Sequence, residues 1–285
     1  MFSPFEYVKA ENLEEVFELL DKNDDAQIIA GGTDLLVKLR EAKSSPETLI
    51  DIKGLEELKG IKKEGNKVKI GALTTITELK NSELIKNELF SLYQAASEFG
   101  CYEIRNRATI GGNIVHASPG AEFGVTVFAL DAKVEVVGQD GIKEYPIDEF
   151  WYDVGKVKLK NELLKSIIID IEENTKSSYH RLSRVDGMDL AVVNTALAKK
   201  SDGSYKSYFG TVARTPYRNE EIDQLLNDNN YTNETFKEIQ KIVDENVSPR
   251  ASSLRASPEY KKKMVVSLLK RCLRDIGELG DDIDG

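Results

Sequence analysis

Two pairs of adjacent glycines are the residues whose types and spacing point most directly to chemistry. The first pair lies in Ala-Gly-Gly-Thr-Asp-Leu-Leu at residues 30–36, and the second in Ala-Thr-Ile-Gly-Gly-Asn at residues 108–113. Each segment sets two residues without a Cβ beside hydroxyl or amide side chains, so backbone N–H groups can close on an anion. Two such cradles predict a ligand with an extended polyphosphate body, for which a nucleotide cofactor is the simplest candidate.

In the first glycine segment (residues 30–36), a strand is expected to deliver Gly31 and Gly32 to the start of a helix. A helix N-terminus offers about four unpaired N–H groups and the positive end of the helix dipole. Thr33 adds a hydroxyl donor. The Asp34 carboxylate would repel a diphosphate, so we expect its side chain to point away from one. An ordinary strand-to-helix connection with capping residues remains an alternative interpretation.

The second glycine segment (residues 108–113) is predicted to be a turn in which Gly111 and Gly112 precede Asn113. The asparagine amide can both donate and accept hydrogen bonds. Thr109 precedes the glycines and His116 follows them. A purely structural turn is the alternative for this segment taken alone, but two such segments within one region favour a ligand site.

Several other kinds of site are disfavoured by the sequence. The two histidines, His116 and His180, lack the spacing of a Ser-His-Asp triad or a metal site, and the two cysteines, Cys101 and Cys272, are too few for an iron–sulfur cluster. No Rossmann or Walker phosphate-binding motif is present. The net charge of −10 disfavours nucleic acid as a partner. We expect no membrane insertion and a cytoplasmic location, because the N-terminus lacks signal-peptide features.

The elements that position the first glycine segment are predicted from hydrophobic periodicity. Strands are expected at residues 5–8, 26–30 and 48–52, the second of them buried, with a helix capped by Asn12 after the first strand. A helix after the second strand should turn Leu35, Leu36 and Leu39 inward. This alternation predicts βαβ units and a small parallel sheet.

The rest of the chain reads as a mixture of helices, hairpins and strands. Helices are expected from Thr75 and at residues 87–99 and 123–130, a hairpin at residues 134–145, and a strand at residues 164–171. A polar segment at residues 172–178 is interpreted as a domain boundary. Beyond it the sequence predicts antiparallel strands at residues 179–184, 191–199 and 205–212, and helices at residues 219–226, 233–246 and 258–273. Lys261, Lys262 and Lys263 are expected on a solvated helix face.

These motifs carry a resemblance to a known family. The chain resembles the FAD-binding medium subunit of the molybdenum hydroxylases, the family of xanthine, nicotinate and carbon monoxide dehydrogenases. The first glycine segment is similar to its first flavin motif, and Ile-Arg-Asn-Arg-Ala-Thr-Ile-Gly-Gly-Asn at residues 104–113 to its second. The similarity continues through residues 150–151, 162–164 and 189–191 to Arg-Ala-Ser-Pro-Glu-Tyr at residues 255–260, in the family's order.

The resemblance implies an α+β fold. A PCMH-type FAD-binding domain would occupy residues 1–173, divided into a small βαβ part at about residues 1–54 and a larger mixed α+β part at residues 55–173, with FAD between them. A C-terminal α+β domain with a three-stranded antiparallel sheet and helices would occupy residues 178–285.

The resemblance also implies which residues hold the cofactor, with no catalytic or metal-binding residue of the chain's own. They are Ile28, Ile29, Ala30, Gly31, Gly32, Thr33, Asp34, Leu35, Phe99, Thr109, Gly111, Gly112, Asn113, Ile114, His116, Glu122, Leu164 and Arg181. Phe99 falls where the family places an aromatic side chain near the adenine. Glu122 replaces the usual Asp near the flavin ring, and Arg181 replaces a Lys whose charge would stabilise the reduced ring. An exposed strand arginine is the alternative for Arg181.

The activity implied by the resemblance is electron transfer within a larger enzyme. FAD would be bound non-covalently and would pass electrons from [2Fe-2S] clusters of a partner small subunit to NAD⁺ or another acceptor. Molybdopterin would belong to a partner large subunit. Two alternatives stay open from the sequence: a self-contained flavin oxidase or dehydrogenase with its own small-molecule substrate, and a non-enzymatic nucleotide-binding or scaffold protein.

Overall fold

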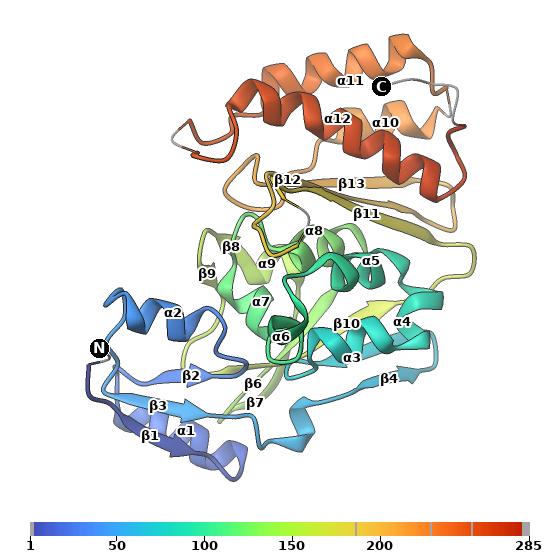
Figure 1. Ribbon diagram of the computed structural model, residues 1–285. Helices are drawn as coiled ribbons and strands as arrows, with labels where there is room; N and C mark the ends of the chain where they lie inside the picture. The colour runs from blue at the N-terminus through green and yellow to red at the C-terminus, as the bar shows by residue number, and fades with distance from the viewer. Residues whose placement is uncertain (1–2, 186, 229, 252, 281–285) are drawn as a thin grey trace.

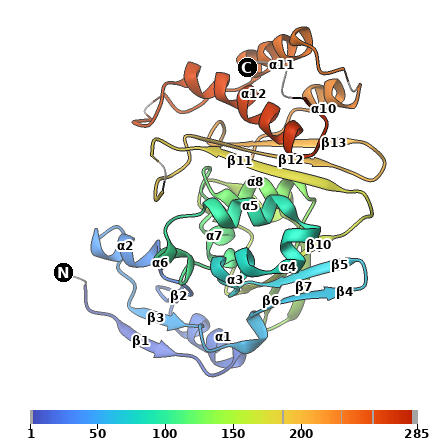
Figure 2. The ribbon, with the colours of Figure 1, turned by 45° about the vertical axis from the view of Figure 1, so that its right-hand side comes forward.

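The computed structural model describes residues 3–185, 187–228, 230–251 and 253–280. Figure 1 shows three consecutive parts: a small N-terminal part, a larger middle part, and a C-terminal part in which a sheet lies beneath the last helices. Figure 2 shows the same arrangement from a second side, with helices of the middle part between its own sheet and the C-terminal sheet.

The small part is the predicted parallel βαβ unit. Its elements are β1 (Glu6–Lys9), α1 (Leu13–Lys22), β2 (Gln27–Ile29), α2 (Leu35–Arg40) and β3 (Thr48–Asp51). The strands are all parallel, in the order β1-β3-β2, which confirms the prediction. Asn12 caps α1 by accepting a hydrogen bond from the backbone N–H of Glu15.

Two details of the small part were predicted wrongly. Leu36 on α2 is 42% exposed, whereas Leu39 is buried as expected. Strand β2 is only half-buried, because it forms an edge of the three-stranded sheet and Ile28 packs only partly against the core and also lines a cavity. Hydrophobic side chains at this edge therefore line open space, which a pattern of apolar residues cannot distinguish from a core.

The middle part is built on a five-stranded antiparallel sheet in the order β4-β5-β10-β6-β7. Its sheet strands are β4 (Ile61–Glu64), β5 (Lys67–Gly71), β6 (Lys133–Gly138), β7 (Gly141–Pro146) and β10 (Leu163–Asp170). A short 3-10 helix, Glu56–Leu58, leads into it, and a small hairpin is formed by β8 (Trp151–Asp153) and β9 (Lys156–Val157). The β6–β7 hairpin was predicted; strand β4 and the β8–β9 hairpin were not.

Helices of the middle part cover one face of this sheet. They are α3 (Ile76–Asn81), α4 (Glu83–Glu88), α5 (Phe90–Glu98), α6 (Tyr102–Arg105), α7 (Ile110–His116), α8 (Glu122–Ala129) and α9 (Ile147–Phe150). Thr75 begins α3 with a capping box, as predicted. The single helix expected over residues 87–99 is wrong, because the chain leaves helical geometry at Leu89 and so ends α4 and begins α5.

The C-terminal part is an antiparallel sheet of β11 (Lys176–Leu182), β12 (Val193–Lys199) and β13 (Tyr205–Gly210), which confirms the predicted three strands. Helices α10 (Glu220–Asn227), α11 (Asn233–Asn246) and α12 (Pro258–Asp275) also match their predicted positions closely. The last five residues of the expected domain lie outside the described residues. Lys261 corrects the solvated lysine face, since it is only 5% exposed and donates to the Thr211 carbonyl.

Buried apolar side chains connect these parts rather than separating them. One cluster lies between the five-stranded sheet and its helices and includes Tyr179 and Ala196 of the C-terminal sheet. A second fills the space between that sheet and α10–α12. A third joins α1 to Val137 and Leu163 of the middle part. The small part is therefore packed on the middle part, and Ile52, Leu73 and Leu163 of this third cluster also line a cavity between the two parts.

Candidate functional site

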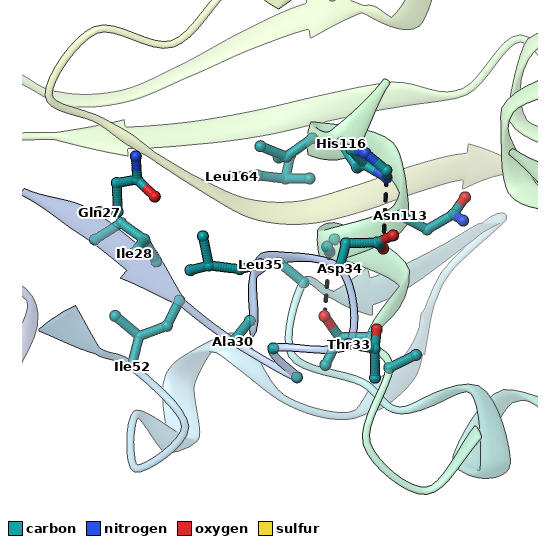
Figure 3. Close-up of a pocket in the computed structure, with 18 of the residues that line it drawn as sticks. Gln27, Ile28, Ala30, Thr33, Asp34, Leu35, Ile52, Asn113, His116 and Leu164 are labelled. Carbon is teal, nitrogen blue, oxygen red and sulfur yellow. Dashed lines mark hydrogen bonds and ion pairs between the residues drawn. The ribbon is translucent and has the colours of Figure 1, made fainter. Parts of the chain in front are cut away.

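A cavity of about 690 Å³ lies between the small part and the middle part. This volume is within the range of small-molecule and cofactor sites. Most residues that the sequence pointed to line it: Ile28, Ala30, Gly31, Gly32, Thr33, Asp34, Leu35, Phe99, Thr109, Gly111, Gly112, Asn113, His116 and Leu164. Figure 3 shows Gln27, Ile28 and Ile52 at one end of this view, and Asp34, Asn113 and His116 at the other.

The first glycine segment presents its backbone to this cavity. Among the described residues, the N–H groups of residues 31–35 donate no hydrogen bond, and the first helical N–H to find a partner is that of Leu36, which donates to Gly32. Gly32 adopts a left-handed φ of +74°, which turns the chain from β2 toward α2. The prediction of unpartnered amides at a strand-to-helix connection is therefore confirmed for this segment.

Gly31 has a packing role of its own. A Cβ atom on Gly31 would lie 2.0 Å from the Arg107 carbonyl oxygen and 3.0 Å from the Cα of Ala108. The two glycine segments thus meet backbone to backbone, which no side chain at residue 31 would permit. This contact closes one wall of the cavity.

The second glycine segment is built differently from the prediction. It is not a turn but the first turn of helix α7, with Thr109 as the N-cap. The Ile110 and Gly111 N–H groups donate to Thr74 and Ala72 of the middle part, and those of Gly112 and Asn113 to the side chain and carbonyl of Thr109. The predicted cradle of bare amides is wrong here, because every one of these donors already has an acceptor.

What this segment offers the cavity is therefore side-chain chemistry and room. The Asn113 carboxamide lines the cavity, and its Oδ1 atom is buried without a hydrogen-bond partner. A Cβ on Gly111 would lie 2.6 Å from Ala72, whereas a Cβ on Gly112 would meet only the Thr109 hydroxyl, at 3.0 Å. Gly111 is required for helix packing. Gly112, which has no side chain, leaves space in the cavity beside Asn113.

Asp34 and His116 connect the two segments across the cavity. The His116 Nδ1 atom lies 3.4 Å from the Asp34 carboxylate, and Figure 3 shows the two side chains facing each other. The hydrogen bond from His116 lowers the pKa of Asp34, against the opposing effect of burial. The Asp34 carboxylate was expected to point away from the ligand; it instead lines the cavity, where it is paired with an imidazole.

Four of the expected residues do not line the cavity. Ile29 and Ile114 are buried in apolar clusters. Glu122 and Arg181 form a buried pair at 3.4 Å, and the Arg181 side chain is only 6% exposed, so the alternative of an exposed strand arginine is wrong. Arg181 also donates to the carbonyl oxygens of Gly187 and Asp189.

Burial raises the pKa of Glu122 to about 7, although Arg181 lowers it in part. Asp34 adds to the increase, which places this buried pair within electrostatic reach of the cavity.

Phe99 lies on the same side of the cavity as that pair. Its ring centroid is 5.8 Å from that of Phe123, the residue after Glu122. Its chain neighbour Glu98 lies 3.5 Å from Arg181. An extended dinucleotide places its two ring systems at opposite ends, so an adenine beside Phe99 and a flavin ring beside Glu122 and Arg181 are competing interpretations.

Several residues of the cavity were not predicted from the sequence. They are Ala26, Gln27, Lys38, Lys43, Ser44, Ile52, Ala72, Leu73, Ala108, Val115, Gly155, Leu159, Glu162 and Leu163. Ser44 donates to the Gln27 carboxamide at 2.9 Å and forms a polar end with it. Gly155 and Leu159 arrive from the unpredicted β8–β9 hairpin and the loop after it, so only the glycine at residue 155 offered a local signal.

This arrangement suits an elongated anionic ligand. Unpartnered amides, a buried unpaired carboxamide oxygen and lysines at one end can bind phosphate and polar groups, while Leu35, Leu164 and Phe99 can cover apolar surface. In the part of the chain that the structure describes, no group of His, Cys, Asp and Glu is arranged to hold a metal ion. No helix within those residues has the length and apolar character needed to cross a membrane.

Comparison with protein families matches both regions of the chain. Residues 3–170 match the FAD binding domain in molybdopterin dehydrogenase, and residues 177–276 match the CO dehydrogenase flavoprotein C-terminal domain. The chain is 31% identical to a xanthine dehydrogenase FAD-binding subunit of Escherichia coli O157:H7, covering 96% of this chain and 97% of that protein. It is 31% identical to a nicotinate dehydrogenase FAD-subunit of Eubacterium barkeri, covering 95% and 96%.

Solved structures give the same result for the fold. The chain superimposes with a TM-score of 0.88 on carbon monoxide dehydrogenase from Hydrogenophaga pseudoflava lacking the Mo-pyranopterin moiety, at 31% identity over 96% of this chain and 97% of that one. A Cu,Mo-CO dehydrogenase in its cyanide-inactivated form gives a TM-score of 0.90 at 26% identity, covering 98% and 100%. The expected α+β fold is thereby confirmed.

Proposed function

The chain belongs to the family defined by the FAD binding domain of molybdopterin dehydrogenases, and from this premise we propose that its cavity holds FAD between the two glycine segments. Membership makes the chain an FAD-binding oxidoreductase subunit of the medium-chain type. We propose that the chain comprises an FAD-binding domain over residues 1–173 and a C-terminal domain over residues 178–285.

The residues present fit FAD. The unpartnered N–H groups of residues 31–35 are donors for the diphosphate, and the orphaned Oδ1 of Asn113 is an acceptor for a hydroxyl or N–H group of the cofactor. Buried polar atoms without partners cost free energy, so a ligand that satisfies them gains affinity. We propose that FAD is held by such non-covalent contacts.

We place the isoalloxazine ring at the Phe99 end of the cavity and the adenosine at the Gln27–Ser44 end. FAD supplies a ring system that can take up and release electrons. The Arg181 guanidinium, buried and permanently charged, stabilises negative charge near that end. The Gln27 carboxamide and the Ser44 hydroxyl match the nitrogen and hydroxyl groups of an adenosine. This orientation reassigns Phe99 from the adenine to the flavin ring.

The remaining cavity residues position the cofactor. Leu35 and Leu164 face the middle of the cavity and exclude water from it. The Asp34–His116 pair lies beside the proposed diphosphate position, where the imidazole is hydrogen-bonded to the carboxylate. The four first-turn amides of α7 hold that helix to residues 72–74 and to Thr109, and so keep Asn113 in place.

The wider role follows from the kind of enzyme to which the named relatives belong. We propose that electrons arrive from [2Fe-2S] clusters of a small partner subunit and leave to NAD⁺ or another acceptor. A molybdopterin-binding large subunit would oxidise the substrate, in the cytoplasm. What supports this role is that the relatives are named as FAD subunits or medium chains, and that this chain spans 97% and 96% of two of them.

The single observation that carries the cofactor proposal is the row of unpartnered amides opposite Asn113. The test is a titration of the cofactor-free chain with FAD, in which binding is monitored by the quenching of flavin fluorescence. Replacing Asn113 with Ala should weaken binding about tenfold, the amount that about 1.4 kcal/mol of lost interaction represents. Asn87→Ala, at an exposed position of α4, is the matched control and should bind as the wild type does. Equal affinity of both variants would remove Asn113 from the site.

The electron acceptor needs a separate experiment. The FAD-loaded chain should be bleached by NADH in the absence of oxygen, because the flavin end is expected to exchange electrons with the acceptor. Bleaching by a small organic substrate without partner subunits would instead support a self-contained flavin dehydrogenase. Reduction by neither compound would indicate another physiological acceptor while leaving FAD binding unaffected.

A further inference from the structure

A buried carboxyl group and a partly exposed one share a single guanidinium beside the cavity. Arg181 on β11 lies 3.4 Å from Glu122 at the start of α8 and 3.5 Å from Glu98 at the end of α5. The side chains of Arg181 and Glu122 are 6% and 8% exposed, whereas that of Glu98 is 37% exposed. We call these three residues the carboxyl trio. One end of the trio is thus enclosed, and the other reaches solvent.

The trio has one carboxylate more than its single cation can neutralise. Buried ionised groups require a partner, because removing a charge from water is costly. Among the described residues, Arg181 is the cation that lies against Glu122, and its other N–H groups serve the backbone carbonyls of Gly187 and Asp189. Charge balance inside the protein therefore favours one bound proton shared between the two carboxyl groups.

Of the other groups around the trio, Asp34 and Asp275 reinforce this balance, and Arg271 opposes it. The hydroxyl of Tyr179 is buried without a partner, and Asp34 adds negative potential at Glu122 from the cavity side. On the solvent side, Arg271 and Asp275 of α12 act on Glu98 in opposite directions.

Asp275 is itself engaged by His180 at 2.9 Å. The Gln94 and Ser178 side chains also donate to it. Asp275 thus has partners of its own, and Arg181 is the cation that forms ion pairs with both Glu98 and Glu122.

The direction of the pKa shifts agrees with the geometry. Burial raises the pKa of Glu122 to about 7, and burial also raises the pKa of Glu98, with Arg181 opposing both. Near neutral pH the enclosed carboxyl group is therefore poised between its two states. A small added negative charge nearby is enough to shift it toward the protonated state.

We propose that the carboxyl trio binds one proton from solvent when electrons enter the neighbouring cofactor, and releases it when they leave. This inference rests on the proposed position of FAD. Two electrons supplied through the partner subunit add negative charge at the Phe99 end of the cavity. One solvent proton then binds a carboxylate oxygen of Glu122, forming an O–H bond, and no other bond of the chain changes. When the acceptor removes the electrons, this O–H bond breaks and the proton returns to solvent.

The first test needs no cofactor. Infrared difference spectra of the cofactor-free chain should show a protonated-carboxyl C=O band that titrates near neutral pH. The band should disappear in Glu122→Gln and remain in Glu238→Gln, a control at an exposed position of α11. Absence of such a band in the wild type near neutral pH would overturn the inference, whatever the chain binds.

Unfolding of the cofactor-free chain gives a second readout that does not depend on the variant's activity. A carboxyl group whose pKa is raised on folding favours the folded state less as pH increases from its ordinary value, about 4.3, to its folded value. The melting temperature of Glu122→Gln should therefore rise relative to the wild type between about pH 4.5 and about pH 7, and the difference should stay constant above that range. A difference independent of pH would contradict a shifted Glu122.

The decisive test uses the FAD-loaded chain and measures its midpoint potential against pH. One extra proton per two electrons makes the slope steeper by about 30 mV per pH unit. The wild type and Glu238→Gln should show this extra slope from about pH 7 to about pH 9, and Glu122→Gln should lack it. Glu98→Gln provides a second variant, in which the extra slope should shift along the pH axis.

The outcomes separate this inference from the proposed function. If FAD binds and all four proteins give the same slope, the trio does not take up a proton and the inference fails while the function stands. If the chain does not bind FAD, the proposed function fails, and the infrared band then reports only on a carboxyl pair that has no redox role.

Discussion

The two glycine segments share a Gly-Gly pair followed by a polar residue, and the structure uses them in opposite ways. In the first, the N–H groups of residues 31–35 have no acceptor among the described residues. In the second, the N–H groups of residues 110–113 all have one. The first segment therefore offers backbone to a ligand, and the second offers a side chain held by a capped helix. A glycine pair predicts that other atoms approach the backbone closely. Whether those atoms belong to a ligand or to the protein depends on the residues around the pair.

The largest expected effect is a difference in stability between variants of the two glycines in the second segment. Gly111→Ala should destabilise the chain by about 2 kcal/mol, because the new Cβ would lie 2.6 Å from Ala72 and helix α7 must shift. Gly112→Ala, one residue later, should be neutral or stabilising by up to about 1 kcal/mol, since alanine is favoured over glycine within helices. Urea unfolding of both cofactor-free variants measures the contrast. Equal stabilities would show that the packing of α7 against Ala72 is not tight.

Replacements in the first segment need a different design. Gly32 has a φ of +74°, so any side chain there strains the backbone before it meets a ligand. Gly31 is blocked by the Arg107 carbonyl. Loss of FAD from variants at either position would report on the fold of the segment. The role of the backbone N–H donors in this segment is better tested by replacing the neighbouring side chains of Thr33 and Asp34.

Much of the fold was accessible from the sequence, because its signals are local. The capping residues Asn12 and Thr75 begin helices where their side chains predict, and the Gln139-Asp140 turn forms the hairpin expected of it. The C-terminal strands and helices also follow their hydrophobic patterns. These signals depend on neighbours within a few residues, which the sequence displays directly.

The missed features depend on contacts between distant residues. Leu36 satisfies the apolar stripe of α2, yet it is 42% exposed. Lys261 belongs to a basic run, yet it is buried because the Thr211 carbonyl accepts from its amine. In the site, the amides of Ile110 and Gly111 at the start of α7 lose their ligand role to Thr74 and Ala72, which lie more than thirty residues earlier in the chain. Such partners are invisible to a reading of local patterns.

Thr109 and Thr33 provide a second comparison between the two glycine segments, with smaller expected effects. Thr109 caps α7 by accepting from Gly112 at 3.1 Å, so Thr109→Ala should cost about 1 kcal/mol of stability. Thr33 lines the cavity without a cap, so Thr33→Ala should leave stability unchanged and weaken FAD binding several-fold. Thermal unfolding and FAD titration of both variants distinguish the roles. Loss of stability in Thr33→Ala would contradict the division into a donor segment and a packing segment.

The smallest effect concerns Asp34, the residue through which the two segments touch across the cavity. Its carboxylate faces the proposed diphosphate position, so Asp34→Asn should tighten FAD binding a few-fold at low ionic strength, with a smaller gain in added salt. The variant should lose the contribution that His116 makes to acid stability. Since His116 lowers the pKa of Asp34, the wild-type pair stabilises the chain above the ordinary aspartate pKa of about 3.9 and loses this stabilisation as pH falls through the lowered value.

Weaker FAD binding by Asp34→Asn would reverse the interpretation of this contact. It would mean that the carboxylate holds His116 in the orientation that the cofactor needs, and that this orientation outweighs the repulsion between Asp34 and the diphosphate. His116→Gln separates the two cases, because it removes the imidazole and keeps a hydrogen-bond donor. If His116→Gln binds FAD as the wild type does while Asp34→Asn binds more tightly, repulsion by the carboxylate is the dominant effect, and the first glycine segment holds the diphosphate by its amides without help from the imidazole.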